Sequence, residues 1–192
     1  MIEHNIIKNK KNNLIIEGQR IFLREINLSD ANRNYCSWMN DAKANQYLES
    51  RFEKWTIKKL RSYINKVKQN PDYLFLAIVT KDKNRHIGNI KIGPINRIHK
   101  FADIGILIGE RSFCGKGFGS EAIKLVKDYA FGNLRLHKLT AGIYTENLGS
   151  IKAFRKAGFQ QEGLLKKYYF FKDKFIDTII LGILNKKYFQ KN

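Results

Sequence analysis

The chain has 192 residues, of which 43% are hydrophobic and 12% aromatic, and this composition fits one globular domain with its own core. No apolar run approaches the ~20 residues that a membrane-spanning helix needs. The polar and basic segment 1–11 contains no apolar stretch of signal-peptide length. We therefore expect a cytoplasmic protein with no membrane partner. Cys36 and Cys114 match no metal-ligand spacing, so we expect free thiols and no bound metal.

The net charge of +19, from 36 Lys and Arg against 17 Asp and Glu, leaves two interpretations open. One is an anionic partner, such as RNA, a ribosomal surface or a phosphorylated small molecule. The other is compositional bias, because Lys, Asn and Ile are abundant throughout the chain. The basic residues are scattered rather than clustered on one predicted helix, which favours the compositional interpretation.

Hydrophobic periodicity predicts seven strands and four helices. Residues 1–17 are expected to form a loosely attached N-terminal arm, and residues 18–192 a single domain. In chain order, the predicted elements are a strand (20–26), a helix around Tyr35 and Trp38, a helix (56–69), three strands (73–80, 86–93, 103–109), a helix (121–131), a strand (138–144), a helix (148–157) and two strands (159–171, 175–184). Strands with interleaved helices indicate an α/β (α+β) fold around one central sheet.

A glycine-rich loop between a predicted strand and a predicted amphipathic helix is the most informative segment. Gly115, Gly117 and Gly119 alternate, which allows positive φ angles and a close approach of the backbone to a ligand. The first N–H groups of the following helix have no partner within the helix, and the helix dipole there favours negative charge. Together with Lys116, these features predict a phosphate-binding site.

Two other phosphate-binding loops do not match this segment. A P-loop has four residues between its first glycine and Gly-Lys, followed by Ser or Thr, whereas residues 110–114 separate Gly109 from Gly115 and a glycine follows Lys116. A dinucleotide fingerprint reads G-x-G-x-x-G, whereas this loop reads G-x-G-x-G. The sequence therefore does not support an ATPase or a dehydrogenase.

At this loop the sequence resembles motif A of the GNAT superfamily of N-acetyltransferases, Gln/Arg-x-x-Gly-x-Gly/Ala. Cys114 stands where the family has Gln or Arg, which removes one side-chain contact to the pyrophosphate of the cofactor. A second segment, from Asn147 through Ser150 to Gly158-Phe159, resembles the family's Asn-x-x-Ser and Gly-Phe element. The resemblance spans about residues 18–184. It is strongest to the branch that contains the ribosomal-protein alanine N-acetyltransferases and close relatives acting on amino sugars and polyamines.

The resemblance implies a central, mixed, mostly antiparallel twisted sheet of about seven strands, splayed in the middle and flanked by about four helices. It also implies acetyl-CoA as co-substrate. The splay would expose backbone groups of strand residues 106–108 to the pantetheine arm, and the glycine loop would hold the pyrophosphate. Asn147 would either contact the pantetheine arm or simply cap a helix. The implied cofactor-binding residues are Ile106, Leu107, Ile108, Gly115, Lys116, Gly117, Phe118, Gly119, Ser120, Asn147, Ser150 and Phe154.

Direct acetyl transfer needs an oxyanion stabiliser, a proton donor for the leaving thiolate and a base for the amine. A backbone N–H near Leu107 or Ile108 can stabilise the oxyanion. Many relatives have a tyrosine donor where this chain has Phe154, so the resemblance points to Ser150 as the donor, with Tyr144 in reserve. A capping role for Ser150 and a packing role for Tyr144 remain the alternatives. Candidate bases are Glu110, which follows the strand beside the cofactor, and His99, although a solvated loop carboxylate and a surface histidine are the alternatives. The candidate catalytic side chains are therefore Ser150, Tyr144, Glu110 and His99.

With no clear base, an amine of low pKa is the favoured acceptor. An α-amine with a pKa of about 7.7–8.0 is ~10% neutral at pH 7, whereas an amine near 10.4 is neutral in well under ~1% of molecules. A protein N-terminus is therefore expected first and an amino-sugar nucleotide second, with segment 38–51 forming the wall of the acceptor pocket. An inactive CoA-binding regulator and a basic RNA-binding module are the alternatives of other classes. A ribosome or another anionic partner and a homodimer are also expected alternatives.

Overall fold

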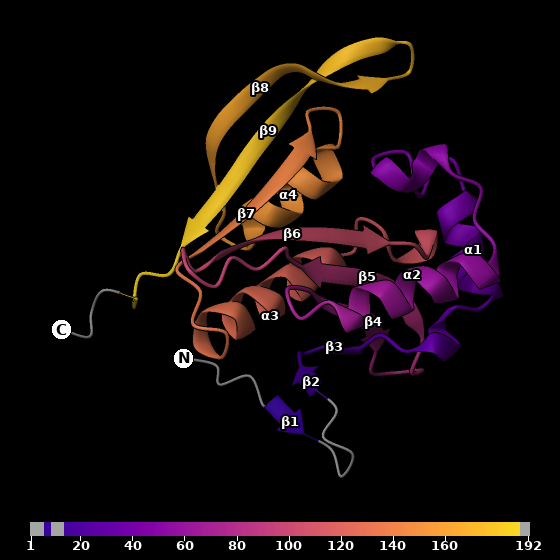
Figure 1. Cartoon of the computed structure of the whole chain (residues 1–192), viewed down its shortest axis with the longest axis horizontal. Helices are drawn as coiled ribbons and strands as arrows, with labels where there is room; N and C mark the ends of the chain where they lie inside the picture. Colours follow the sequence, from indigo (N-terminus) through magenta and orange to yellow (C-terminus); the bar gives the residue numbers. More distant parts are fainter. Residues whose placement is uncertain (1–5, 9–13, 189–192) are drawn as a thin grey trace.

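The computed structural model describes residues 6–8 and 14–188 and shows one sheet of nine strands in the order β1-β2-β3-β4-β5-β6-β7-β9-β8 (Figure 1). Neighbouring strands run antiparallel except β6 and β7, which are parallel. The strands are β1 (Ile6–Lys8), β2 (Leu14–Glu17), β3 (Ile21–Glu25), β4 (Leu74–Thr80), β5 (His86–Ile92), β6 (Phe101–Ile108), β7 (Lys138–Tyr144), β8 (Gln160–Phe171) and β9 (Lys174–Leu184).

The helices begin where polar side chains or glycine satisfy the first turn. Asn32, Thr56 and Asn147 each accept a hydrogen bond from a backbone N–H of the helix that follows, whereas α3 begins after Gly117 in a left-handed conformation. The helices are α1 (Arg33–Asn40), α2 (Ile57–Gln69), α3 (Phe118–Gly132) and α4 (Leu148–Lys156), with short 3₁₀ helices η1 (Leu28–Asp30), η2 (Glu49–Phe52) and η3 (Arg111–Phe113). Within the described residues, no helix is long and apolar enough to cross a membrane.

Two hydrophobic clusters cover the two faces of the sheet. The larger joins the inward side chains of β2–β7 and β9 to α3 and α4, with Phe154 among its largest fully buried side chains. The smaller packs α1 and α2 against the other face through Trp38, Leu60 and Ile64. The sheet is therefore a middle layer between two helical layers, as the helical periodicity of the sequence predicts.

The sheet opens in its middle, and this confirms the predicted splay. β6 and β7 pair only through Phe101–Asp103 and Lys138–Thr140, and the remaining residues of both strands have no register with each other. The edges from Ile104 to Ile108 and from Ala141 to Tyr144 therefore face a widening gap. β7 pairs on its other side with β9 along its whole length, so the two halves of the sheet are each regular.

The predicted fold class is confirmed, and all seven predicted strands are present. The predicted N-terminal arm, residues 1–17, contributes β1 and β2, which pair with each other and, through β2, with β3. Leu14 and Ile16 are buried in the larger cluster, which explains why this short segment joins the sheet. Strands of three and four residues have too little periodicity to be predicted from the sequence.

Candidate active site

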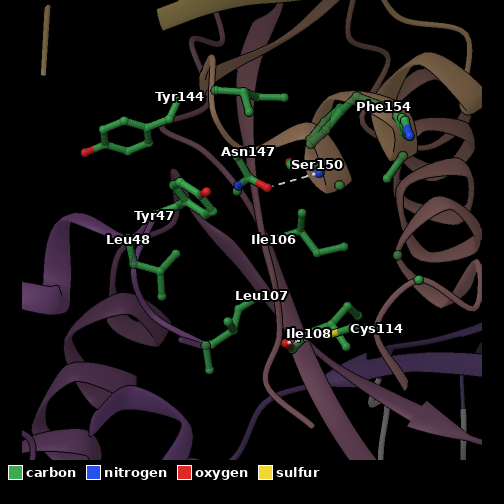
Figure 2. Close-up of a pocket in the computed structure, with 18 of the residues that line it drawn as sticks. Tyr47, Leu48, Ile106, Leu107, Ile108, Cys114, Tyr144, Asn147, Ser150 and Phe154 are labelled. Carbon is green, nitrogen blue, oxygen red and sulfur yellow. Dashed lines mark hydrogen bonds between the residues drawn. The ribbon is translucent and has the colours of Figure 1, made fainter. Parts of the chain in front are cut away.

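A pocket of about 950 Å³ occupies the gap between β6 and β7. β6 lines one side of the pocket, and the end of β7 with α4 lines the other side. The glycine loop and the start of α3 line the floor. Residues 43–48 and Lys172 close the remaining side. Figure 2 shows Leu48 on one side of the pocket and Ser150 on the other, with Asn147 and Ile106 between them. From the segment 38–51, expected to form the wall of the acceptor pocket, five residues line this pocket: Lys43, Ala44, Gln46, Tyr47 and Leu48.

The backbone of β6 offers hydrogen-bonding groups to this pocket at alternate residues. Gly109, the residue after β6, donates to the carbonyl of Ile87 on the β5 side at 3.0 Å. Successive residues of a strand direct their backbone groups to opposite edges. Leu107 therefore bonds toward β5, while Ile106 and Ile108 direct their N–H and C=O groups into the gap. This corrects the prediction that Leu107 supplies a backbone contact to the pocket.

The glycine loop has the geometry that its sequence predicts. Gly115 and Gly117 have φ angles of +73° and +85°, a region that side chains disfavour. Gly117 is the N-cap of α3 and makes no side-chain cap, so the first N–H groups of α3 face the pocket without a partner from the cap residue. At Gly119 a Cβ atom would meet only Ile108 and Ile106 side chains, at 3.7 and 3.8 Å.

Arg20, at the start of β3, holds this loop from behind. Its guanidinium donates to the carbonyl of Lys116 at 3.0 Å and to a carboxylate oxygen of Glu121 at 3.0 Å. It also lies 4.3 Å from the ring centroid of Phe118, within range of a cation–π interaction. With the Lys116 carbonyl directed toward Arg20, this carbonyl is kept from the phosphate side of the loop. No local pattern indicates this contact, because Arg20 and Glu121 are far apart along the chain.

Five cationic side chains line the pocket. Arg111, Lys152 and Lys156 belong to η3 and α4, next to the glycine loop, while Lys43 and Lys172 belong to the opposite wall and to the β8–β9 turn. Among the lining residues that the structure describes, none is Asp or Glu. None of these five residues was among the predicted site residues, although the spacing of Lys152 and Lys156 places both on one face of α4.

Asn147, Ser150 and Phe154 lie together on the β7–α4 side of the pocket. The side-chain oxygen of Asn147 accepts a hydrogen bond from the backbone N–H of Ser150 at 3.1 Å, so Asn147 does cap α4 (Figure 2). The cap uses the backbone N–H of Ser150 and not its hydroxyl, and Ser150 lines the pocket. Phe154 is 1% exposed and packs edge-on against Phe159 with ring centroids 5.0 Å apart.

The side chain of Tyr144, at the end of β7, is fixed by two charged groups. Its hydroxyl donates to Glu49 and accepts from Arg51, the latter at 2.9 Å. Burial and the bond to Glu49 raise the pKa of Tyr144 to about 12. Figure 2 shows its hydroxyl on the side away from Ser150. Tyr144 therefore stays protonated at neutral pH, and its proton is shared with Glu49.

Aromatic side chains continue this wall toward the β8–β9 hairpin. Tyr47 stacks on Phe171 at 5.3 Å between ring centroids, and its hydroxyl donates to the carbonyl of Glu146 at 3.1 Å. Arg51 donates to the carbonyl of Phe170 at 2.9 Å. These contacts join the segment around η2 to the hairpin across the mouth of the pocket.

Four predicted site residues lie outside the pocket lining. Glu110 accepts a hydrogen bond from Arg85 at 2.7 Å and another from Ser112. His99 is exposed and stacks near Phe101, at the closed end of the gap. Lys116 and Phe118 are not among the pocket-lining residues either, and the Phe118 ring packs against Phe113 and under Arg20. The full set of pocket-lining positions among the predicted residues is Ile106, Leu107, Ile108, Gly115, Gly117, Gly119, Ser120, Tyr144, Asn147, Ser150 and Phe154.

The family follows from comparison with known proteins. A family model described as an acetyltransferase (GNAT) domain matches residues 20–160. The chain is 30% identical to a probable N-acetyltransferase, YjcK, of Bacillus subtilis, over 89% of this chain and 97% of that protein. The chain belongs to the GNAT acetyltransferase family. It is an N-acetyltransferase, as its relatives are named.

Other relatives carry more specific names. The chain is 31% identical to spermidine N(1)-acetyltransferase of Vibrio cholerae over 59% of this chain and 66% of that protein. The structure of spermidine N-acetyltransferase from Vibrio cholerae in complex with CoA and spermine matches with a TM-score of 0.78 and 26% identity, over 88% of this chain and 98% of that one. An acetyltransferase (GNAT family) from Bacillus anthracis matches with a TM-score of 0.77 and 22% identity, over 88% and 98%.

GNAT acetyltransferases use acetyl-CoA, and the residues of this pocket fit such a donor. The unpaired backbone edge of Ile106 and Ile108 matches an amide-containing arm such as pantetheine. The N-terminus of α3, with its positive-φ glycines, matches a pyrophosphate. Arg111, Lys152 and Lys156 add positive charge where the remaining phosphate would lie. Cys114 adds no charge, because burial raises the pKa of its thiol.

Proposed function

We propose that this GNAT acetyltransferase transfers an acetyl group from acetyl-CoA to the α-amine of a protein N-terminus, as in the ribosomal-protein alanine acetyltransferase branch. The charge of the pocket carries the proposal. Lys43 and Lys172 lie on the acceptor side, and no carboxylate is among the described lining residues. A neutral or anionic acceptor with one amine of low pKa fits this positively charged side of the pocket better than a polycation does.

A polyamine acceptor, as in the names of the spermidine acetyltransferases, fits less well. One carboxylate oxygen of Glu49 accepts from Tyr144 and Arg51, and Glu49 is not among the described residues that line the pocket. A polyamine in the pocket would meet Lys43 and Lys172 with no carboxylate among those lining residues. Like charges at short range disfavour binding.

The residues have separate roles in the proposed transfer. Acetyl-CoA supplies an acetyl thioester as the electrophile. The backbone N–H of Ile108 donates to the thioester oxygen as negative charge develops there. The Ser150 hydroxyl gives a proton to the departing sulfur, and Asn147 fixes the turn of α4 that carries it. The amine nitrogen forms the new C–N bond as the C–S bond breaks, and the proton that the amine loses passes through water to the Ser150 oxygen, which restores the hydroxyl.

An amine of low pKa makes a dedicated base unnecessary. Glu110 and His99 lie outside the pocket lining, and Glu110 is paired with Arg85. An α-amine is ~10% neutral at pH 7 without assistance. The proposed acceptor therefore agrees with the absence of a carboxylate or histidine among the described lining residues.

An amino-sugar nucleotide is the second candidate acceptor, and Lys43 with Lys172 is the observation that favours it. The two ammonium groups stand on the acceptor side and would meet the phosphates of such a substrate. A double substitution, Lys43→Ala with Lys172→Ala, would raise the KM of a sugar nucleotide far more than that of a neutral peptide.

A thiol-release assay with purified protein and acetyl-CoA tests the proposal. The acceptors are neutral peptides with a free N-terminus, the same peptides with a blocked N-terminus, an amino-sugar nucleotide and spermidine. We expect turnover with the free peptides and none with the blocked ones. Spermidine as the preferred acceptor would refute the proposed acceptor. Acetyl-CoA binding in calorimetry without turnover on any amine would leave the inactive-regulator alternative.

A further inference from the structure

The β8–β9 hairpin extends beyond the rest of the sheet. The last pair between β7 and β9 joins Tyr144 to Thr178, so residues 165–177 project past the end of β7 (Figure 1). The side of this projection that faces the pocket is occupied, because Tyr169 packs on Tyr144 with ring centroids 4.7 Å apart and Phe171 is buried. The hairpin is thereby held rigidly beside the acceptor mouth.

The opposite side of the projection presents aromatic rings to solvent. Phe170 and Phe175 are cross-strand partners, and their ring centroids lie 5.4 Å apart. Their exposed fractions are 49% and 61%. Tyr168 is also exposed, but it lies within a register shift of β8 and its ring packs against Tyr169. We call Phe170 and Phe175 the outer face of the hairpin. Two large rings exposed side by side indicate a contact site.

Lysines surround the outer face. Residues 165–177 hold four lysines (166, 167, 172 and 174) against two aspartates, a net charge of +2 (four minus two). One aspartate, Asp177, already accepts a bond from the backbone of Lys167 at 2.7 Å, and Lys174 pairs with Glu146 at 2.8 Å. Lys166, Lys167 and Lys172 therefore set the sign of the local field.

This charge argues against a second copy of the chain as the occupant. Two copies would bring hairpins of equal positive charge together on molecules that each carry +19. β8 is the last strand of the sheet, and lysines on an edge strand oppose the addition of another strand. The complementary partner is a polyanion that also offers flat apolar faces.

We propose that the outer face of the hairpin and its lysines bind single-stranded RNA. Bases stack on exposed aromatic rings without sequence preference, and lysines neutralise the phosphates between them. Lys172 lines the acceptor pocket, so the positive charge of the hairpin extends from the outer face to the pocket mouth. This surface goes beyond the proposed acetyl transfer and does not depend on it. RNA binding is expected whether the acceptor is a peptide or a sugar nucleotide.

Fluorescence anisotropy with a labelled oligouridylate, at several salt concentrations, tests this proposal. Two charge-matched variants separate the hairpin from the overall charge. Lys166→Ala with Lys167→Ala and Lys66→Ala with Lys68→Ala each lower the net charge from +19 to +17 (19 minus 2), but the second pair lies on α2. If both hairpin lysines contact phosphates, the first variant lowers the slope of log affinity against log salt by about 1.4, and the second leaves it unchanged.

The aromatic rings are tested with Phe170→Ser and Phe175→Ser together, against Ile98→Ser, an even more exposed apolar side chain, as the control. We expect at least about a ten-fold loss of RNA affinity for the ring variant and none for the control. Equal losses in the two lysine variants would overturn the proposal, and so would tighter binding of polyglutamate than of RNA. If the parent protein sediments as a dimer and the ring variant as a monomer, the outer face is a contact between two copies of the chain, which would overturn the proposal.

Discussion

Arg20 offers a sharp test of how the glycine loop works, because it acts on the loop without lining the pocket. In Arg20→Ala the loop loses the bond to the Lys116 carbonyl, the charged pair with Glu121 and the contact with Phe118. The backbone N–H of Arg20 still donates to Glu121 at 2.8 Å, so β3 stays attached to α3. The variant therefore frees the loop while leaving the fold in place.

The size of the effect follows from these contacts. A hydrogen bond to a charged group contributes about 1.5–3 kcal/mol, and an exposed cation–π contact about 0.5–1 kcal/mol. The side chain of Arg20 is 46% exposed, so solvent screening reduces both, and we take about 2 kcal/mol for ordering the loop. Since each 1.4 kcal/mol is a factor of ten, the KM for acetyl-CoA should rise about thirty-fold.

Steady-state kinetics with acetyl-CoA varied at saturating acceptor measure this change. We expect kcat at saturation to stay within about two-fold of the parent, because Arg20 touches no reacting group. Arg97→Ala is the matched control, since it removes the same charge and an exposed ion pair with Asp72 at 3.3 Å. An unchanged KM in Arg20→Ala, or an equal rise in Arg97→Ala, would refute the reasoning.

Three further predictions concern the loop, the donor and the core. Gly117→Ala strains a φ of +85°, so it should lower stability by about 1–2 kcal/mol and weaken acetyl-CoA binding. Gly119→Ala meets only ordinary contacts, so it should raise the melting temperature slightly and leave acetyl-CoA binding intact. Thermal melts and calorimetry measure both effects. Ser150→Ala should lower kcat about a hundred-fold without changing the melting temperature, because the cap uses its backbone N–H; an unchanged kcat would exclude it as donor. Burial lowers the pKa of His86 below its ordinary 6.5, so the unfolded chain binds this proton more tightly and stability declines as the pH falls below about 6.5. His86→Gln should flatten that decline in urea unfolding between about pH 6.5 and 5, and a parallel decline in both proteins would contradict this account.

Local sequence patterns predicted most of the fold and the phosphate end of the site. Alternation and helical periodicity depend on neighbouring residues, so they located every strand from residue 20 onward. Gly115 and Gly117 were interpretable for the same reason, because a positive φ is a property of the residue itself. The cap made by Asn147 is also local, being three residues from its partner.

The acceptor end could not be predicted, because its contacts join distant segments. Tyr144 meets Glu49 and Arg51 across nearly a hundred residues, and no pattern in either segment indicates the other. Glu110 was a candidate base because it follows β6, but the turn that begins there directs its carboxylate to Arg85. The predicted backbone contact of Leu107 to the pocket is wrong for a different reason, since the edge that a strand residue faces depends on its register with β5.

The three-residue junction between β6 and β7 has a mechanical consequence. Among the described residues, the paired segments 101–103 and 138–140, with the bonds that Lys100 accepts from His137 and Lys138, tie the two half-sheets together through the backbone, so the halves meet at a narrow hinge. A donor molecule seated between them would act as an inserted tenth strand and brace the hinge. The amides of Ile106 and Ile108 should then exchange with deuterium far more slowly when the donor is bound, and the whole chain should melt at a higher temperature.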